Sequence, residues 1–189
     1  MTSTTAPGRT SGTTGATLWF TGLPSAGKTT LATALAERLT SRDRPVELLD
    51  GDAVRAILSP ELGYSRADRD ANVARIGWVA SLLARNGALV LAAVVSPFAD
   101  ARDGVRKLHD SEGSAFFEVH VSTPVQVCAD RDVKGLYAKQ RAGNLAGLTG
   151  IDGEYEPPSE PELRIDTSGR TVDQAVEELI ALLEKENLL

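Results

Sequence analysis

The stretch "FTGLPSAGKTT", from Phe20 to Thr30, decides the fold of this chain. Gly22 is followed after four residues by Gly27, Lys28 and Thr29, which matches the spacing G-x-x-x-x-G-K-[ST]. In such a loop, backbone N–H groups surround a phosphate, the lysine supplies a cation and the threonine offers its hydroxyl to magnesium. An ordinary glycine-rich turn is the alternative, but the apolar run "ATLWF" before the loop and a helical pattern after it favour a nucleotide-binding P-loop.

Apolar, β-prone runs on either side of this loop predict five strands, at residues 16–20, 45–50, 88–95, 115–121 and 162–167. Helical spacing is clearest over 29–39 and 66–87, and capping boxes are expected at Ser65 with Asp68 and at Thr171 with Gln174. The last helix is expected to turn four side chains toward the core: Val172, Val176, Leu179 and Leu183. Strands that alternate with helices predict an α/β fold, a doubly wound parallel sheet of the P-loop NTPase type.

Length and composition fit one globular domain, with 189 residues of which 42% are hydrophobic and 24% charged. We expect a flexible polar tail over residues 1–16 and a single domain over 17–189. The segment from about 131 to 161 has no sustained apolar period and is long for a connection, so we expect it to be a mobile lid.

Charge and cysteine content narrow the classes of partner and compartment. Cys128 is the single cysteine, so no intramolecular disulfide is possible. A net charge of −6 indicates that the chain does not bind nucleic acid, because phosphate-backbone binding relies on clustered Lys and Arg. The longest apolar run, 88–95, is far short of the roughly 20 residues of a membrane-spanning helix, and the first residues lack the apolar core of a signal peptide. We therefore expect a cytoplasmic protein without a membrane partner.

Two carboxylates follow the second predicted strand, in "LLDGDAVR". At the end of a strand beside a P-loop, a carboxylate can hold magnesium or accept a proton from an attacking hydroxyl. We assign this role to Asp52, because it begins the following helix, and we expect Asp50 to support it. The alternative is that Asp52 only caps that helix.

Further polar residues are expected to face the same crevice. Arg69 and Asn72 share one helical face and are suited to grip one substrate group, whereas Arg66 and Arg75 are expected on a solvated face. Ser96 ends the third strand, where it would either bond a substrate, accept a phosphate itself or start a turn. Between Arg131 and Arg141 the single acid, Asp132, is outnumbered by cations suited to polyanion binding and to neutralising a transferring phosphoryl group, or to a solvated loop: Arg131, Lys134, Lys139 and Arg141.

Together, "GLPSAGKTT", "LLDGDAVR", "LGYSRADRDANVARIGWVA", "VVSPF", "DVKGLYAKQRAG" and "LTGIDGEYEPP" closely resemble the adenylylsulfate kinase (APS kinase) family over residues 17–189. The resemblance implies a cytoplasmic kinase that moves the γ-phosphoryl group of MgATP to the 3′-hydroxyl of adenosine 5′-phosphosulfate (APS). The products would be 3′-phosphoadenosine 5′-phosphosulfate (PAPS) and ADP, in sulfate activation. It also implies a homodimer and a sulfate adenylyltransferase as partner.

The resemblance also implies the site residues. Lys28 and Asp52 would be catalytic, and Thr29 with Asp52 would hold Mg²⁺. ATP would be bound by Gly22, Leu23, Pro24, Ser25, Ala26, Gly27, Lys28, Thr29, Thr30 and Arg131. The substrate would be bound by Asp52, Arg55, Tyr64, Arg69, Asn72, Val95, Ser96, Lys134, Gly135, Leu136 and Leu148, with Ser96 as a candidate phospho-acceptor.

Three positions depart from the family pattern. Leu148 stands where phenylalanine is common, Ala99 where a basic residue is usual, and Ala53 where asparagine is frequent. Three alternatives to an APS kinase stay open, of which Leu148 and Ala99 favour only the first. They are a P-loop kinase of another small hydroxyl-bearing metabolite, a non-catalytic nucleotide-binding subunit of a sulfate-activating assembly, and a PAPS-dependent sulfotransferase.

Overall fold

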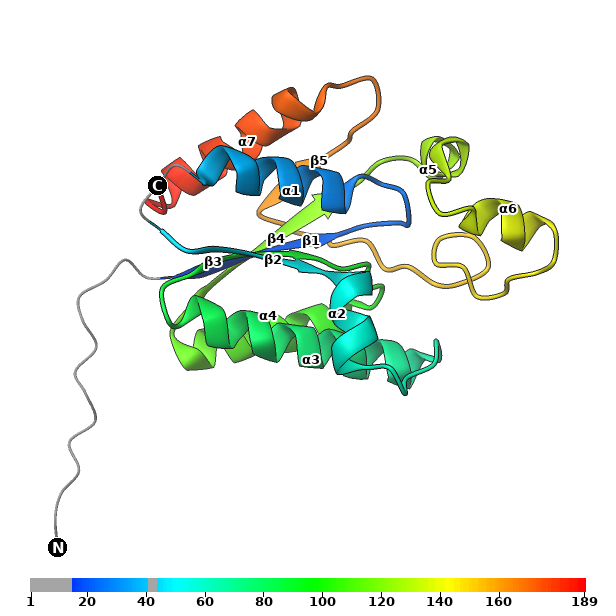
Figure 1. Cartoon of the computed structure of the whole chain (residues 1–189), viewed down its shortest axis with the longest axis horizontal. Coiled ribbons are helices and arrows are strands. Elements are labelled where there is room, and N and C mark those ends of the chain that lie inside the picture. Colours follow the sequence, from blue (N-terminus) through cyan, green and yellow to red (C-terminus); the bar gives the residue numbers. More distant parts are fainter. Residues whose placement is uncertain (1–14, 41–43) are drawn as a thin grey trace, which may run out of the picture.

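Five parallel strands form the centre of the fold in the computed structural model, which describes residues 15–40 and 44–189 (Figure 1). The strands are β1 (Ala16–Thr21), β2 (Val46–Asp50), β3 (Leu89–Ala93), β4 (Ala115–Val121) and β5 (Leu163–Ile165). Their order is β2-β3-β1-β4-β5, with β1 paired to both β3 and β4. The predicted doubly wound α/β sheet is confirmed, and each predicted strand is present within a few residues of its expected bounds.

The predicted tail needs one correction. Residues 1–14, most of that tail, lie outside the described residues. Ala16, however, is the first residue of β1 and is fully buried, because its neighbours pair with β3 and β4 on both sides. The ordered domain therefore begins before residue 17.

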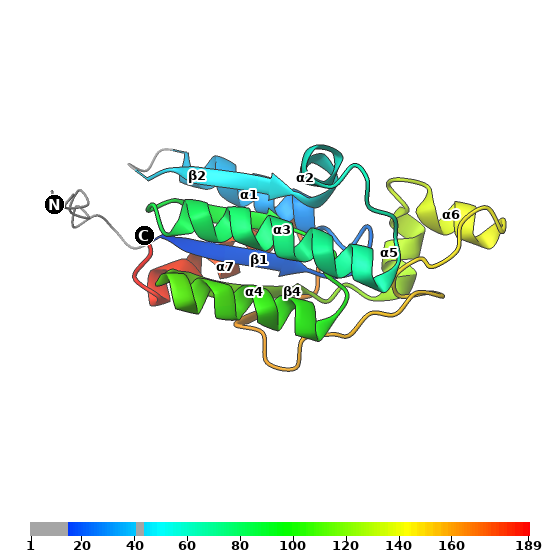
Figure 2. The same ribbon diagram turned by 90° about the horizontal axis from the view of Figure 1, so that it is seen from below.

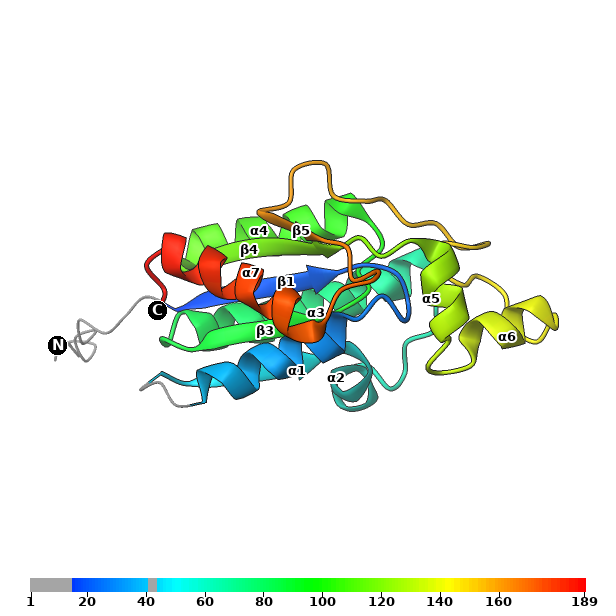
Figure 3. The same ribbon diagram turned by 90° about the horizontal axis from the view of Figure 1, so that it is seen from above.

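Helices cover both faces of the sheet. α1 (Lys28–Leu39) and α7 (Val172–Lys185) pack together on one face, as Figure 3 shows from that side. α3 (Arg66–Ala84) and α4 (Ala99–Glu112) pack together on the other face, which Figure 2 shows. Burial of apolar side chains on both faces, with Leu18 and Leu35 on the α1 side and Ile76 and Val105 on the α3 and α4 side, supplies the main favourable free energy of folding.

The helix caps set where α3 and α7 begin. Both predicted capping boxes are present, at Ser65 with Asp68 and at Thr171 with Gln174, where each cap hydroxyl accepts the third backbone N–H of its helix. One prediction for α7 is wrong. Val172 does not face the core but is 41% exposed, since it lies in the first turn, where the helix end borders a pocket.

Three short helices lie at the carboxyl ends of the strands: α2 (Gly51–Leu58), α5 (Val125–Arg131) and α6 (Leu136–Arg141) (Figure 1). α6 lies within the segment expected to be a lid, although no apolar period predicted it. Its first turn is held by polar contacts instead, because the Asp132 carboxylate accepts the backbone N–H groups of Tyr137 at 3.0 Å and Ala138 at 2.9 Å. No helix in the described ranges is long and apolar enough to cross a membrane.

Candidate active site

A pocket of about 740 Å³ lies at the carboxyl ends of the strands, between the P-loop and the predicted lid. It brings together residues that are far apart in the sequence. The predicted site residues that line it are Pro24, Ser25, Gly27, Lys28, Thr29, Thr30, Asp52, Arg55, Tyr64, Arg69, Asn72, Val95, Ser96, Arg131, Lys134, Leu136 and Leu148. Four predicted residues are not part of this lining: Gly22, Leu23, Ala26 and Gly135.

The P-loop connects β1 to α1 in a conformation that requires glycine. Gly27 has φ of 109°, in the left-handed region that side chains disfavour, and it precedes the first residue of α1. Lys28 folds back over the loop, and its Nζ donates to the backbone oxygens of Gly22 at 2.9 Å and Leu23 at 2.7 Å. Burial lowers the pKa of the Lys28 ammonium to about 8. The loop therefore holds a desolvated cation beside the N-terminus of a helix, which favours a bound anion.

An acidic corner faces the loop from the start of α2. Asp50 caps this helix, because its Oδ1 accepts the backbone N–H groups of Asp52 at 3.0 Å and Ala53 at 3.1 Å. Its other oxygen accepts the hydroxyl of Thr29 at 2.7 Å. The capping role considered for Asp52 thus belongs to Asp50, and the Asp52 carboxylate is left exposed, where it forms an ion pair with Lys134 of the lid.

These oxygens suit a magnesium ion held partly by phosphates. Within residues 15–40 and 44–189, no cluster of three or more His, Cys, Asp or Glu side chains is placed to enclose a metal. Mg²⁺ bound with a nucleotide does not need such a cluster, since it usually takes one or two protein oxygens, waters and phosphate oxygens. The hydroxyl of Thr29, in contact with Asp50, and the exposed carboxylate of Asp52, which pairs with Lys134, supply oxygens of that kind.

Two arginines flank an aromatic ring on the opposite wall. The guanidinium carbon of Arg55 lies 4.6 Å, and that of Arg69 5.6 Å, from the centre of the Tyr64 ring, which is 73% exposed. Arg69 also crosses to the lid segment, where it donates to the Gly147 carbonyl at 3.0 Å and the Thr149 hydroxyl at 3.1 Å. Burial, and then the charge of Arg55, lower the pKa of Arg69 from its usual range. Two guanidinium groups therefore concentrate positive charge on this wall.

Asn72 lies one helical turn beyond Arg69 on α3, as its spacing predicted, and both line the pocket. The Asn72 side chain is 6% exposed, and its Oδ1 has no hydrogen-bond partner among the described residues. An unpaired buried amide oxygen is costly unless a ligand or water donates to it. The position is thus suited to receive a donor group of a bound substrate.

Ser96 is placed differently from what its sequence position suggested. The residue is 1% exposed, and its Oγ accepts the indole N–H of Trp19 at 3.0 Å and donates to the Val94 carbonyl at 3.3 Å. Its φ of 40° turns the side chain toward the sheet rather than toward the crevice. This geometry speaks against Ser96 as a phospho-acceptor, because the hydroxyl is committed to the core. The neighbouring Val95 presents its carbonyl to the Thr21 hydroxyl at 2.7 Å.

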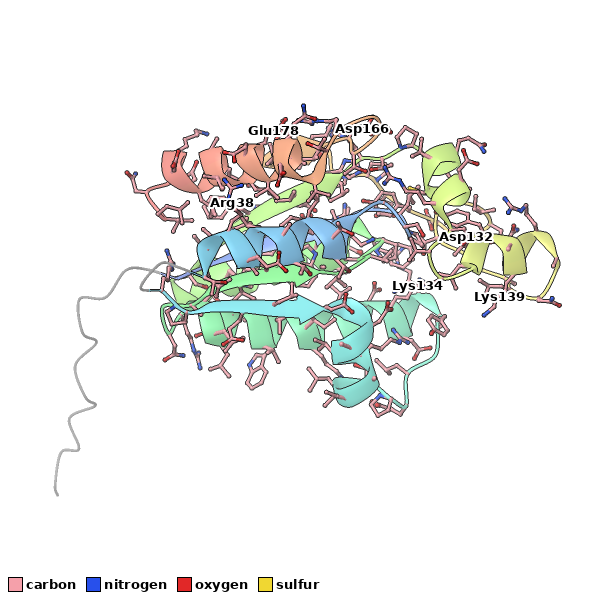
Figure 4. All side chains as sticks on the ribbon, turned by 45° about the horizontal axis from the view of Figure 1, so that its top comes forward. Arg38, Asp132, Lys134, Lys139, Asp166 and Glu178 are labelled. Carbon is pink, nitrogen blue, oxygen red and sulfur yellow. The ribbon has the colours of Figure 1, made fainter. Side chains whose placement is uncertain are left out.

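The lid residues divide between the two ends of the pocket. Arg131 bonds to Thr167 beyond β5, with 2.7 Å to its hydroxyl and 3.0 Å to its carbonyl oxygen. Lys134 lies across from α2, and Figure 4 shows it on the side of the lid that faces the body of the protein. Leu148 borders the pocket but is mostly buried in the main core cluster. Gly135 caps α6 with φ of 66° and so shapes the lid without lining the pocket.

Sequence reasoning missed part of one end of the pocket, the end beside β5 and α7. This end is lined by Thr167, Arg170, Thr171, Val172 and Ala175, which follow β5 or begin α7. The available signal was positional, since residues after a parallel strand lie at the ligand-binding edge of the sheet. Val172 in particular shares the helical spacing of Val176, Leu179 and Leu183, which favoured a place in the core.

A phosphate loop faced by an exposed carboxylate, with the cations Arg131 and Lys134 lining the same pocket, is typical of a P-loop kinase. Solved structures of low identity support the fold alone, for example a gluconokinase from Sinorhizobium meliloti 1021, with 21% identity and a TM-score of 0.60 over 94% of this chain and 97% of that one.

More similar proteins identify the family. The family model described as "Adenylylsulphate kinase" matches residues 14–166, and the chain belongs to this family. The adenylyl-sulfate kinase of Synechococcus sp. (strain JA-3-3Ab) is 47% identical over 93% of this chain and 97% of its own length. The solved APS kinase CysC of Mycobacterium tuberculosis, in complex with AMPPNP and APS, is 45% identical, with a TM-score of 0.88 over 91% of this chain and 99% of that one.

Proposed function

We propose that this chain is an adenylylsulfate kinase that transfers the γ-phosphoryl group of MgATP to the 3′-hydroxyl of adenosine 5′-phosphosulfate. The observation that carries the proposal is that one pocket joins the P-loop to the exposed carboxylate of Asp52 and to the wall formed by Arg69 and Asn72. A nucleotide triphosphate and an anionic acceptor can therefore occupy it side by side. Membership of the adenylylsulfate kinase family supports this choice of acceptor.

The donor end of the pocket would hold ATP. The backbone N–H groups of the P-loop would surround the β-phosphate, and Lys28 would exchange its contacts with Gly22 and Leu23 for phosphate oxygens. Thr29 and Asp52 would hold magnesium, which neutralises charge on the β- and γ-phosphates when bound. Arg131 reaches the opposite rim of this end, where it would contact the nucleotide.

The acceptor end would hold the second adenylate. The guanidinium groups of Arg55 and Arg69 are suited to its phosphosulfate, and the exposed ring of Tyr64 offers its adenine a stacking surface. Leu148 would give an apolar cover in place of a second ring. This arrangement favours an anionic, aromatic acceptor over a neutral sugar-like alcohol.

In the transfer step, the 3′-oxygen of the acceptor forms a bond to the γ-phosphorus while the bond from that phosphorus to the β–γ bridging oxygen breaks. The proton of the 3′-hydroxyl passes to the carboxylate of Asp52, and the electron pair of the broken bond stays with ADP. Lys134, released from Asp52 as the acceptor enters, would stabilise charge on the transferring group.

A coupled assay of ADP release tests this proposal. We expect ADP to form only when ATP, magnesium and APS are all present, and Lys28→Ala to lose most turnover while remaining folded by circular dichroism. A panel of other hydroxyl acceptors is the control. Transfer to another acceptor but not to APS would show a kinase of a different substrate, and no turnover with any acceptor would support a non-catalytic role. Formation of a sulfated product from PAPS would instead indicate a sulfotransferase.

We also propose that the chain acts in the cytoplasm as a homodimer that receives APS from a sulfate adenylyltransferase. Large apolar side chains that stay exposed, Ile57 and Trp78 among them, support the idea of a subunit contact. One chain has a mass of 20.0 kDa. Sedimentation equilibrium would give twice that mass if the protein is a homodimer. Co-purification with the adenylyltransferase would test the second partner.

A further inference from the structure

Three side chains from outside the P-loop converge on a single oxygen within it, the backbone carbonyl of Ala26. The hydroxyl oxygen of Thr123 lies 2.9 Å from it, that of Thr167 3.0 Å and Nη1 of Arg131 3.4 Å. Thr123 follows β4, Arg131 ends α5 and Thr167 follows β5. The peptide that joins Ala26 to Gly27 is thus held from behind by three separate parts of the chain.

The two threonines and the arginine form one connected network. The hydroxyl oxygens of Thr123 and Thr167 lie 2.7 Å apart, and the backbone N–H of Thr167 donates to the Thr123 hydroxyl at 3.3 Å. Arg131 adds bonds to the hydroxyl and the carbonyl of Thr167. Because a hydroxyl has one proton but can accept two more, Thr123 can donate to Ala26 while it accepts from Thr167. The first residue of the lid is therefore tied to the phosphate loop.

Fixing this carbonyl also fixes the group on the other side of the same peptide. In a trans peptide, the C=O of one residue and the N–H of the next point in opposite directions. The Ala26 carbonyl points toward the threonines, so the N–H of Gly27 is directed away from them, and Gly27 lines the pocket. N–H groups at such a helix start are the ones that bind phosphate.

We propose that Thr123 is a positioning residue for the phosphate donor, which acts through the Ala26 carbonyl to hold the Gly27 N–H toward the bound phosphate. The inference rests on the proposed use of ATP, but it concerns nucleotide binding and not the choice of acceptor. Of the three residues, Thr123 is best suited to test this indirect role, because it would not contact the nucleotide itself. Thr167 and Arg131 both line the pocket, whereas Thr123 is 3% exposed and is not among the described residues that line it.

Titration calorimetry of MgADP binding without acceptor, together with the KM values for ATP and APS, tests the proposal. Thr123→Val removes the hydroxyl but keeps the shape of the side chain, and Thr123→Ser keeps the hydroxyl. Thr17→Val is the matched control, since Thr17 is a fully buried threonine whose hydroxyl bonds to His109 Nε2 at 2.8 Å, outside the pocket. If Thr123→Val does not fold, Thr123→Ala takes its place.

Loss of one hydrogen bond of ordinary strength predicts that Thr123→Val weakens MgADP binding and raises the KM for ATP by about three- to tenfold. The KM for APS stays unchanged, Thr123→Ser binds like the wild type, and Thr17→Val leaves both KM values unchanged. Wild-type affinity in Thr123→Val, or equal weakening by Thr17→Val, would overturn the proposal. Failure of the wild type to bind MgADP would refute the proposed function as well, whereas binding without transfer to APS would refute only the acceptor.

Discussion

Lys134 of the lid and Asp52 of α2 form an ion pair across the mouth of the pocket. Both side chains are largely exposed, 58% and 70%, so the pair adds at most about 1 kcal/mol to stability. Its importance lies in where it is formed. The pair places the ammonium group of Lys134 on the carboxylate that we propose receives the acceptor proton, so in the proposed reaction Lys134 and a bound acceptor compete for the same group.

We therefore predict that Lys134→Ala lowers kcat by about tenfold to a hundredfold, because it removes a cation from the transferring phosphoryl group. The melting temperature should fall by no more than about 4 °C, since an exposed pair contributes at most about 1 kcal/mol to stability. Lys139→Ala is the control, since Lys139 lies on α6 outside the pocket lining, farther from the body of the protein in Figure 4. Equal activity of the two variants would contradict a role for Lys134 in the transfer.

The depressed pKa of Lys28 predicts a pH dependence of nucleotide binding. Burial lowers this pKa to about 8, so the free protein loses the cation as the pH rises through that value. The dissociation constant for MgADP should be constant below about pH 7 and increase above pH 8. In Lys28→Arg the guanidinium stays charged, so its binding, though weaker, should be flat over this range. A wild-type profile as flat as that of the arginine variant would contradict the assignment.

The same shift has the opposite sign for folding stability. Between pH 8 and the ordinary lysine value of 10.5, the unfolded chain binds a proton at Lys28 that the folded protein does not. The contribution of Lys28 to the free energy of unfolding therefore increases as the pH rises through this window. Lys28→Met should remove this increase, as measured by urea unfolding at several pH values. A slope that persists in the variant would assign the effect to other groups.

Arg69 links the acceptor wall to the lid through two donor groups, and a lysine cannot reproduce that geometry. We predict that Arg69→Lys raises the KM for APS by about tenfold and leaves the affinity for MgADP unchanged. Arg75→Lys is a matched control on the same helix, where Arg75 pairs with the exposed Glu61 away from the pocket. Steady-state kinetics with each substrate varied in turn would check this, and a change in the KM for ATP alone would contradict it.

Arg102 anchors the C-terminal part of the predicted lid segment. Its guanidinium is buried and contacts Glu118 at 2.5 Å, the Ser96 carbonyl at 2.8 Å and the Glu156 carbonyl at 2.8 Å. Arg102→Met should lower the free energy of unfolding by about 3–5 kcal/mol, because it leaves the buried Glu118 carboxylate with only the more distant Arg106, at 3.8 Å, and adding Glu118→Met should recover much of that loss. Denaturant unfolding would measure both variants. If the double variant lost as much free energy of unfolding as the two single variants together, this would contradict an interaction between Arg102 and Glu118.

An exposed ion pair provides the comparison for Arg102. Arg38 and Glu177 lie 2.6 Å apart on α1 and α7, with both side chains about half exposed. Arg38→Met should change stability by no more than about 1 kcal/mol, because solvent screens the pair. A loss of stability as large as that of Arg102→Met would show that burial does not decide how much each ion pair contributes.

The sheet and the P-loop could be predicted because their signals are local. Apolar runs, capping boxes and the G-x-x-x-x-G-K-[ST] spacing each lie within a few consecutive residues. Helical spacing also paired Arg69 with Asn72, and the family resemblance added Arg55 and Tyr64. The helix α6 escaped prediction because polar contacts to Asp132, rather than an apolar stripe, hold its first turn.

Contacts between distant segments could not be predicted in the same way. Ser96 looked like a crevice residue until its contact with Trp19 placed the hydroxyl in the core. Thr123 and Thr167 carry no local signal, since they meet Ala26 from 97 and 141 residues away. The orientation of a short polar side chain depends on such partners, and only the folded chain reveals them.

The identity of the phosphorylated product tests the central claim most directly. The protein is incubated with magnesium, APS and ATP that carries a radioactive γ-phosphate, and the products are separated and treated with a phosphatase specific for 3′-phosphates. The account predicts label in a product one phosphate heavier than APS, with all of that label released by the phosphatase. Label that never enters an APS-derived product, or that resists the 3′-specific phosphatase, would contradict it.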